Sequence, residues 1–351
     1  MSGLRVGMLS LEAWDEVWRR NQHLAARVVR SGSVSALQFV TPPAPGLSVR
    51  AASASPEPGV EVITPPLIVP RRFGGHRVIG AWARRRLGNI DVLWVNDPVA
   101  GIAVARAGVP LVYDITDDWR SMPQDATSRD RIVAAEDVLA RRADATVVCS
   151  SVLADRWRDR YGIDARVIPN GVDVDAIRGA EPVSLDDERP NVVYVGTVHG
   201  NRVDLDLVSE LATSGSVAFH LVGPDGLAES ERDRLVARGV HLHGAVPSAQ
   251  VPSWLLAADV LICPHLVNDF TLSLDAIKAH EYLATDRPVV ATPSSGFQQL
   301  SADGLAVVEP GEFAAAVTAA VGTAPFSRPA PASWADRAEA FAEVLRTAAG
   351  R

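Results

Sequence analysis

The chain has 351 residues, of which 47% are hydrophobic and 22% are charged, and its formal net charge is −8. This composition is typical of an ordinary folded protein of about two domains, and the acidic balance argues against nucleic acid as a partner. Its apolar runs are too short to cross a membrane. Two isolated cysteines, Cys149 and Cys263, favour buried thiols in a reducing compartment. We therefore expect a cytoplasmic protein.

Short apolar runs alternate with helical segments through the first half of the sequence. Polar residues directly follow two of these runs, as Asn96 and Asp97 and as Thr116, Asp117 and Asp118. Repeated strand, loop and helix predict a parallel sheet with helices on both faces. Ligands bind such sheets at the carboxyl ends of the strands, where these polar residues fall. The predicted strands are residues 4–10, 34–40, 60–63, 90–95, 111–115, 145–150 and 165–168.

Two segments of this half break the alternation. Residues 41–59 are rich in proline, serine and alanine, which predicts an irregular excursion with little packed structure. The segment from Arg71 to Arg86 contains six arginines, which we interpret as a solvated face. The same arginines could give the chain a peripheral contact with an anionic lipid surface.

A second series of strands and helices begins after residues 175–190, which are acidic and unpatterned. We predict an α/β chain with two doubly wound, Rossmann-like domains facing a central cleft that holds the ligand. The domains are residues 1–174 and 190–330, and a terminal helix over residues 331–351 could cross back to the first domain. The predicted strands of the second domain are residues 191–195, 217–222, 240–243, 260–263, 289–291 and 305–308.

Residues 268–293 carry the most informative chemistry. Ser273 can N-cap a predicted helix over residues 274–284, and a helix N-terminus at the carboxyl edge of a sheet can bind an anion. Lys278 in this helix is the only lysine, so 33 of the 34 Lys and Arg residues are arginine. A compact ammonium is not interchangeable with a guanidinium at a phosphate, although chance survival of a solvated lysine is an alternative. Glu281 lies one turn later on the same face.

Five motifs in the second half occur in an order that resembles a known family. They are PNGVD at 169–173, YVGTVHGNRVDLDLVSELA at 194–212, LVGP at 221–224, HLHGAVPSAQVPSWLLAADVLICP at 241–264 and IKAHEYLATDRPVVAT at 277–292. Together they resemble the retaining nucleotide-sugar glycosyltransferases of the GT-B fold, in the family-4-like group of glycosyltransferase group 1 type. The segment YDITDDW at 113–119 is similar to one branch of that group. The resemblance covers the second domain well and the first domain loosely.

The resemblance implies a donor site on the second domain and an acceptor site on the first. Lys278 and Arg202 match the cationic pair that binds the diphosphate and stabilises the leaving group without a metal. Asp117 and Asp118 would orient the acceptor hydroxyl, and no cofactor is expected. The implied donor-binding residues are Gly196, Thr197 and Gly223 at glycine turns, Arg202 and Lys278 at the diphosphate, Glu281 at the ribose, the backbone near Val246 at the base, and His265, Asn268 and Asp269 at the transferred sugar.

The chain departs from the family pattern in both domains. Ser273 stands where many relatives have a glutamate that touches the donor sugar, so Asp269 or Asp275 would have to compensate, or the sugar would differ. In the first domain, residues 12–15 read Glu-Ala-Trp-Asp where many relatives have a Gly-Gly loop. These carboxylates are expected to face the cleft.

A cluster of aspartates and a single histidine also invite a functional interpretation. Asp114, Asp117 and Asp118 suggest a metal, but their spacing is no metal signature by itself, and we favour structural or acceptor roles. His23, on the first predicted helix, is more often a capping or packing residue than a catalytic one.

We therefore predict a metal-independent, retaining glycosyltransferase that moves a sugar from a nucleoside diphosphate to a hydroxyl of a natural product or cell-envelope glycan. One alternative is a nucleotide-sugar epimerase or hydrolase of the same fold, with His265 and Asp269 as acid and base. Another is a catalytically silent nucleotide-binding partner of a second transferase. The residues do not specify the sugar, the base, the acceptor, retention over inversion, or the oligomeric state.

Overall fold

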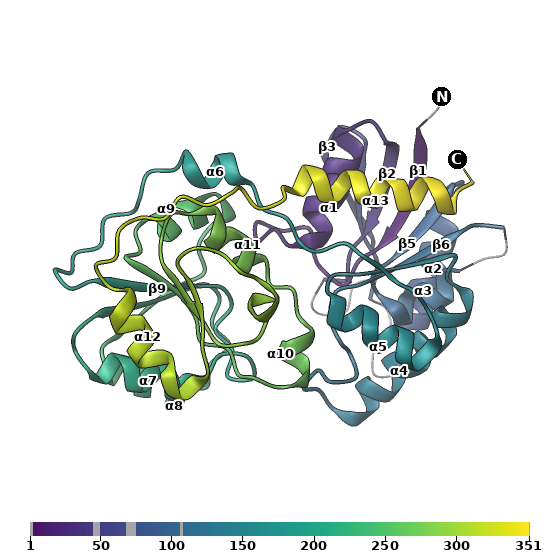
Figure 1. Ribbon diagram of the computed structural model, residues 1–351. Coiled ribbons are helices and arrows are strands. Elements are labelled where there is room, and N and C mark those ends of the chain that lie inside the picture. The colour runs from purple at the N-terminus through teal and green to yellow at the C-terminus, as the bar shows by residue number, and fades with distance from the viewer. Residues whose placement is uncertain (1–2, 45–49, 68–74, 106–107, 351) are drawn as a thin grey trace. The chain divides into compact units, whose positions relative to one another are not determined.

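A computed structural model of the protein describes residues 3–44, 50–67, 75–105 and 108–350. The chain divides into two compact units (Figure 1). The first unit consists of Met1–Pro169 and Trp334–Arg351, and the second consists of Asn170–Ser333. The chain therefore leaves the first unit, builds the whole second unit, and returns.

The first unit contains a largely parallel sheet with the strand order β3-β4-β2-β1-β5-β6-β7-β8 in its described residues. Of the strands that the structure describes in this sheet, only β3 runs antiparallel to its neighbour, β4. Because β2 and β5 lie on opposite sides of β1, the winding direction reverses between β1 and β5. The strands are β1 (Leu4–Leu9), β2 (Val34–Val40), β3 (Ala52–Glu57), β4 (Val60–Thr64), β5 (Val92–Val95), β6 (Leu111–Ile115), β7 (Ala145–Val148) and β8 (Arg166–Val167).

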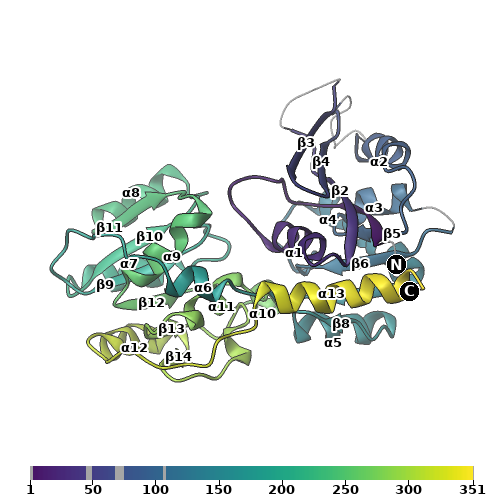
Figure 2. The same cartoon turned by 90° about the horizontal axis from the view of Figure 1, so that it is seen from above.

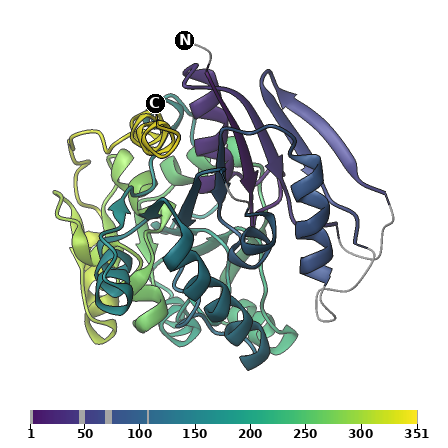
Figure 3. The ribbon, with the colours of Figure 1, turned by 90° about the vertical axis from the view of Figure 1, so that its right-hand side faces the viewer.

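Helices cover both faces of this sheet. On one face a core forms between the sheet and α2 (Gly75–Arg86), α3 (Pro98–Val104), α4 (Ala126–Arg142) and α5 (Ser151–Tyr161). On the other face α1 (Arg20–Arg30) lies alongside α13 (Trp334–Ala348) (Figure 2, Figure 3). Trp334 stacks on His23 with ring centroids 4.4 Å apart, and Phe341 packs 4.3 Å from Trp94. The terminal helix is thus part of the first core.

The second unit contains a parallel sheet with the order β11-β10-β9-β12-β13-β14 in the described residues. Alternate residues of β9 pack into hydrophobic cores on opposite faces of the sheet, with Val192 and Tyr194 on one face and Val193 and Val195 on the other. Its winding reverses between β9 and β12. The strands are β9 (Asn191–Val195), β10 (Ala218–Val222), β11 (Val240–Gly244), β12 (Val260–Cys263), β13 (Val289–Ala291) and β14 (Leu305–Val307). The helices are α6 (Val174–Arg178), α7 (Leu205–Thr213), α8 (Glu229–Ala237), α9 (Val251–Leu256), α10 (Asp269–Ser273), α11 (Ile277–Ala284) and α12 (Phe313–Ala320).

Three local predictions differ from the structure. The predicted helix over residues 274–284 starts later, because α10 ends at Ser273 and α11 begins at Ile277. Ser273 therefore caps no helix, and its hydroxyl donates to the Phe270 carbonyl at 2.7 Å. Residues 41–59 are not wholly irregular, since β3 pairs with β4 there, although residues 45–49 lie outside the described part. The helix α8 was not predicted.

The basic segment is only partly described. Arg71 and Arg72 fall outside the described residues, whereas Arg84 and Arg85 are exposed at the end of α2 and Arg86 pairs with Glu61. The lipid contact stays a prediction. Among the described residues, no helix combines the length and the apolar character that a membrane crossing requires.

Candidate functional site

Lys278 lies in the first turn of α11 at the carboxyl edge of the second sheet, and its side chain is half-buried. Its ammonium donates to the Tyr194 hydroxyl at 2.9 Å and lies 3.3 Å from Nε2 of His265. It also sits 4.4 Å from the centroid of the Tyr194 ring. These contacts hold the ammonium in place without neutralising it.

His265 follows β12 and is buried beneath this ammonium. Burial lowers the pKa of His265 well below its usual value, and the charges of Lys278 and Arg202 lower it further. Its Nδ1 lies 2.7 Å from the Ser295 hydroxyl, and its Nε2 faces Lys278, which can only donate. The ring is therefore neutral, with Nε2 as the acceptor and the proton on Nδ1.

Arg202 provides the second cation of the cluster. Its guanidinium lies 5.2 Å from the centroid of the Phe270 ring, and its carbonyl accepts from Leu266 N at 2.7 Å. A bridge between Val203 and His265 joins the same two loops, which follow β9 and β12. Among the described residues, no Asp or Glu pairs with Arg202 or Lys278. The point where the winding reverses thus carries two cations with no anion between them.

Two glycines let the backbone come close to this cluster. Gly196, after β9, has φ +147°, and Gly223, after β10, has φ +141°, conformations that side chains rarely adopt. A Cβ on Gly196 would lie 2.6 Å from Nζ of Lys278, and one on Gly223 would lie 2.2 Å from the Gly196 carbonyl oxygen. Only glycine fits at either position, so the two motif glycines keep open the space beside Lys278.

The helix α11 adds a partial positive charge at the same edge. Ala276 occupies its N-cap position, and no side chain caps it. A helix N-terminus that lacks a side-chain cap keeps donors available for an anion. Together with Lys278 and Arg202, this arrangement can bind a diphosphate-like group.

Glu281 lies one turn beyond Lys278 and is half-buried. Burial raises the pKa of Glu281 to about 7, although the neighbouring charge of Lys278 lowers it. Within the described residues its carboxylate has no hydrogen-bond partner. It can therefore accept bonds from hydroxyl groups of a ligand.

The other predicted donor residues have more varied surroundings. Thr197 is exposed after β9, and Val246 follows β11 and packs against the core. Asn268 caps α10 by accepting from Thr271 N at 2.9 Å, and Asp269 is exposed in the first turn of that helix. The capping role engages the side-chain oxygen of Asn268.

Asp275 is also engaged by the protein itself. One of its carboxylate oxygens lies 2.9 Å from Nε2 of His280, and the other accepts from the backbone amide of Asn170. Asp275 thus joins the PNGVD motif to the turn before α11. This placement does not favour the idea that it replaces the glutamate absent at position 273.

Tyr194 and Ser295 were not predicted as site residues. Tyr194 contacts Lys278, His265 and the Thr197 carbonyl, the last at 3.0 Å. Ser295 has φ +55° and reaches His265 from a loop thirty residues later in the sequence. The alternation of β9 indicated only that Tyr194 is buried, and no sequence signal pointed to Ser295.

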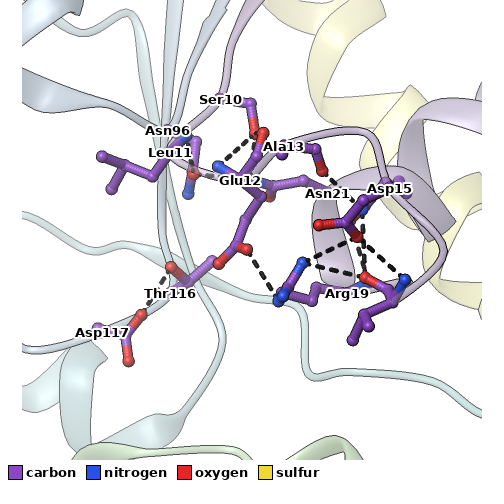
Figure 4. A network of polar contacts seen from close by, with 12 residues as sticks. Ser10, Leu11, Glu12, Ala13, Asp15, Arg19, Asn21, Asn96, Thr116 and Asp117 are labelled. Atoms are coloured by element: carbon purple, nitrogen blue, oxygen red, sulfur yellow. Dashed lines mark hydrogen bonds and ion pairs between the residues drawn. The ribbon is translucent and has the colours of Figure 1, made fainter. Parts of the chain in front are cut away.

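At the corresponding point of the first unit, polar side chains bond to one another (Figure 4). Nδ2 of Asn21 donates to Oδ1 of Asn96 at 2.7 Å and to the Ser10 hydroxyl at 2.9 Å. Arg19 pairs with Glu12 at 3.0 Å and with Asp15 at 3.3 Å. Figure 4 also shows Thr116 beside Asp117, whose carboxylate accepts from the Thr116 hydroxyl at 3.1 Å.

The three aspartates of residues 113–119 have different surroundings, and Asp114 lies within β6 itself. Asp118 is buried, pairs with Arg156, and accepts from the Ser121 hydroxyl at 3.0 Å and from Arg120 N at 3.1 Å. Asp114 is buried against Arg20 and the Trp94 indole, each at 3.2 Å. Asp117 alone is half-exposed. In the described part of the chain, no group of three His, Cys, Asp or Glu side chains could hold a metal ion.

His23 is held by packing. Beyond its stacking on Trp334, its Nδ1 lies 3.0 Å from a guanidinium nitrogen of Arg27. Burial lowers the pKa of His23 to about 3, and the charges of Arg27 and Arg30 act in the same direction. This environment suits the packing role that we favoured.

Two family descriptions match this chain in tandem. Glycosyltransferase Family 4 matches residues 19–176, and Glycosyl transferases group 1 matches residues 189–323. The chain is 27% identical over 331 residues to a D-inositol 3-phosphate glycosyltransferase of Streptomyces scabiei, with 81% of this chain and 70% of that protein covered. It is 25% identical over 319 residues to the protein of the same name from Streptomyces avermitilis, with 80% and 67% covered.

Solved structures show the same architecture. A UDP-forming α,α-trehalose-phosphate synthase from Burkholderia vietnamiensis superposes with a TM-score of 0.71 at 15% identity, covering 100% of both chains. Anabaena Alr3699/HepE in complex with UDP-glucose gives a TM-score of 0.64 at 18% identity, covering 97% of this chain and 95% of that one. The predicted fold and family are confirmed, and the chain is a glycosyltransferase of the GT-B fold, in the family-4-like group of glycosyltransferase group 1 type.

Proposed function

We propose that this glycosyltransferase moves a sugar from a nucleoside diphosphate sugar to a hydroxyl group, with retention of configuration at the transferred carbon. The observation that carries the proposal is the pair of cations, Lys278 and Arg202, which no carboxylate neutralises among the described residues. A cluster of this kind is stabilised when a dianionic group enters it.

The chemical step needs the properties that this cluster offers. The bond between the sugar carbon and the diphosphate oxygen breaks, and negative charge grows on the leaving oxygen. Lys278, Arg202 and the first amides of α11 stabilise that charge. The acceptor oxygen forms the new bond on the same face, and its proton passes to the leaving diphosphate. The cations of the chain supply this stabilisation themselves, so we propose that no resident metal is required.

Glu281 is proposed to bind the ribose of the donor. Its carboxylate has no partner among the described residues, and in the ionised form it can accept from two neighbouring hydroxyl groups. Val246, after β11, is proposed to lie near the base, and Asp117 is proposed to orient the acceptor hydroxyl. Because the protein engages Asp118 on three sides, we assign it the task of holding that loop.

The choice of nucleotide takes its support from proteins of the same fold. Alr3699/HepE has been solved with UDP and with UDP-glucose, and the Burkholderia synthase is described as UDP-forming. We therefore propose UDP as the first nucleotide to test, with a small-molecule natural product or a cell-envelope glycan as the acceptor class.

Calorimetric titration of UDP, GDP, dTDP and ADP into the wild type and Lys278→Met tests the proposal. One diphosphate should bind the wild type, and the variant should bind it about 100-fold more weakly, because removing a charged partner costs several kcal/mol. Arg238→Met is the matched control, since it removes an exposed cation of the same unit whose guanidinium bonds to Thr213. Equal binding by wild type and Lys278→Met, or no binding of any diphosphate, would refute the proposal.

The environment of His265 bears on the epimerase or hydrolase alternative. Such an enzyme needs an acid and a base beside the sugar, and a histidine whose pKa lies well below its usual value is a weak base. His265 is also held between Ser295 and Lys278. These contacts favour a supporting role for His265 over proton transfer.

A further inference from the structure

A pocket of about 500 Å³ lies at the carboxyl edge of the first sheet. It is formed by the ends of β1, β2 and β5 together with residues of α2, α3 and α4. Its volume falls within the range of small-molecule sites. Leu11, which precedes Glu12 in the sequence, lines the pocket. Trp119, two residues after Asp117, lines it as well.

The walls of this pocket are mainly apolar. Eleven of the eighteen described lining residues are apolar, and they come from six separate segments of the unit. They include Leu9, Val40, Ile79, Val99, Trp119 and Ile132. An apolar concavity of this size is stabilised by a ligand that removes its surface from water.

The charged groups of the pocket do not suit a phosphate. Asp97 accepts from Ala100 N at 3.0 Å and Asp125 accepts from Ser128 N at 3.0 Å, so both carboxylates cap helices. Arg131 is the only cation among the described lining residues. Among the described lining residues, a phosphate dianion would therefore meet two carboxylates, which repel it, and a single guanidinium.

We propose that this pocket receives the apolar body of the acceptor, which makes the acceptor an alcohol or phenol with a substantial apolar part. The hydroxyl of such a molecule would lie at the polar rim near Glu12 and Asp117. This inference rests on the proposed function, because only a transferase has an acceptor. An acceptor of this class differs from the phosphorylated sugar or inositol that appears in the names of the relatives.

The test compares two probes by calorimetric titration, with UDP present throughout. The neutral aromatic alcohol 2-naphthol should bind the wild type, and D-inositol 3-phosphate should not. Val99→Asp should weaken 2-naphthol binding at least about tenfold, because it places a charge on the apolar wall. Ile102→Asp is the matched control, since Ile102 lies on the same helix, is 37% exposed and does not line the pocket.

Two further variants keep the test decisive. Val99→Thr has nearly the same shape, so it should fold even if Val99→Asp does not, and it should weaken 2-naphthol binding by about threefold. Arg131→Met should leave 2-naphthol binding within about twofold, whereas it would abolish binding of a phosphate held by that guanidinium.

The outcomes separate the two proposals. If UDP binds and D-inositol 3-phosphate binds through Arg131, with no 2-naphthol binding, the acceptor inference is wrong and the proposed function stands. If UDP binds but 2-naphthol binding is unaffected by both Val99 variants, the pocket is not the site and the inference is again wrong. If no nucleoside diphosphate binds, the proposed function fails, and the acceptor assignment fails with it.

Discussion

The two sheets reverse their winding in the same way, but the charged side chains at the two reversal points differ in whether they are paired. In the first unit Asn21 donates to Ser10 and Asn96, and Arg19 pairs with two carboxylates. In the second unit Lys278 and Arg202 lie beside a neutral histidine, and within the described residues no carboxylate forms an ion pair with either cation. In the part of the chain that the structure describes, the cation at the first point is paired with carboxylates, and the cations at the second point are not.

This difference shows how one fold can divide two tasks. Geometry alone makes the carboxyl edge of each sheet suitable for a ligand. We propose that the balance of charge then decides which ligand is stabilised there, an anionic donor at the second sheet and a largely apolar molecule at the first. The contrast leads to predictions about what each charged side chain does when it is removed.

The largest expected effect is the loss of stability when the Arg20 side chain is removed. This guanidinium is buried and pairs with the buried Asp114 at 3.2 Å. Arg20→Met should lower the free energy of unfolding by about 3–5 kcal/mol, because it leaves an uncompensated buried carboxylate. Urea unfolding measures this directly. Lys278→Met should show no such loss, since Lys278 has no anionic partner to strand, and an equal loss in both variants would remove the contrast between the two points.

The pH dependence of donor binding should be a smaller effect. Burial raises the pKa of Glu281 from its ordinary 4.5 to about 7 in the folded protein. Because the folded state then binds a proton more tightly than the unfolded state, Glu281 lowers the free energy of unfolding as pH rises from 4.5 to 7. Binding has the opposite sign, because the ribose hydroxyls need the ionised form. The affinity for UDP-glucose should therefore increase about tenfold from pH 6 to pH 8.

Glu281→Gln is the matched variant for this dependence. It keeps the shape and one acceptor but cannot ionise, so its affinity for UDP-glucose should be flat over the same pH range. UDP-glucose is the appropriate ligand because its diphosphate does not titrate there. A wild-type affinity that does not change between pH 6 and pH 8 would contradict the assignment of Glu281.

The smallest expected effect comes from Arg19. Because Glu12 and Asp15 already pair with it, its net field on an anionic donor is weak. Arg19→Met should change the affinity for the nucleoside diphosphate by less than about twofold. A loss as large as that of Lys278→Met would mean that the first point also binds the donor phosphates.

Much of the fold could be predicted because it depends on local periodicity. The alternation of short apolar runs and helices predicted two parallel sheets, and the glycines at 196 and 223 marked the turns where side chains do not fit. Lys278 was recognisable as the only lysine. Its surroundings at Tyr194 and His265 agree with a binding task, although its role in the reaction stays a prediction.

The parts that sequence could not predict depend on distant contacts. The helix expected over residues 274–284 is interrupted before Ile277, where Asp275 bonds to Asn170, a residue 105 positions away. The acceptor role predicted for Asp118 stays a prediction, and its partner Arg156 lies 38 positions along the chain. Neither pairing leaves a periodic signal, so composition and spacing gave no access to them.

The return of α13 to the first unit affects how this chain is made. The ribosome delivers β1 to β8, then all of the second unit, and only then the helix whose Phe341 covers Trp94 and whose Trp334 covers His23. The unit that is begun first is therefore completed second, with part of its apolar face uncovered during the interval. A first half expressed alone to Pro169 would keep that face uncovered permanently, and α13 supplied as a separate peptide should be what rescues it from aggregation.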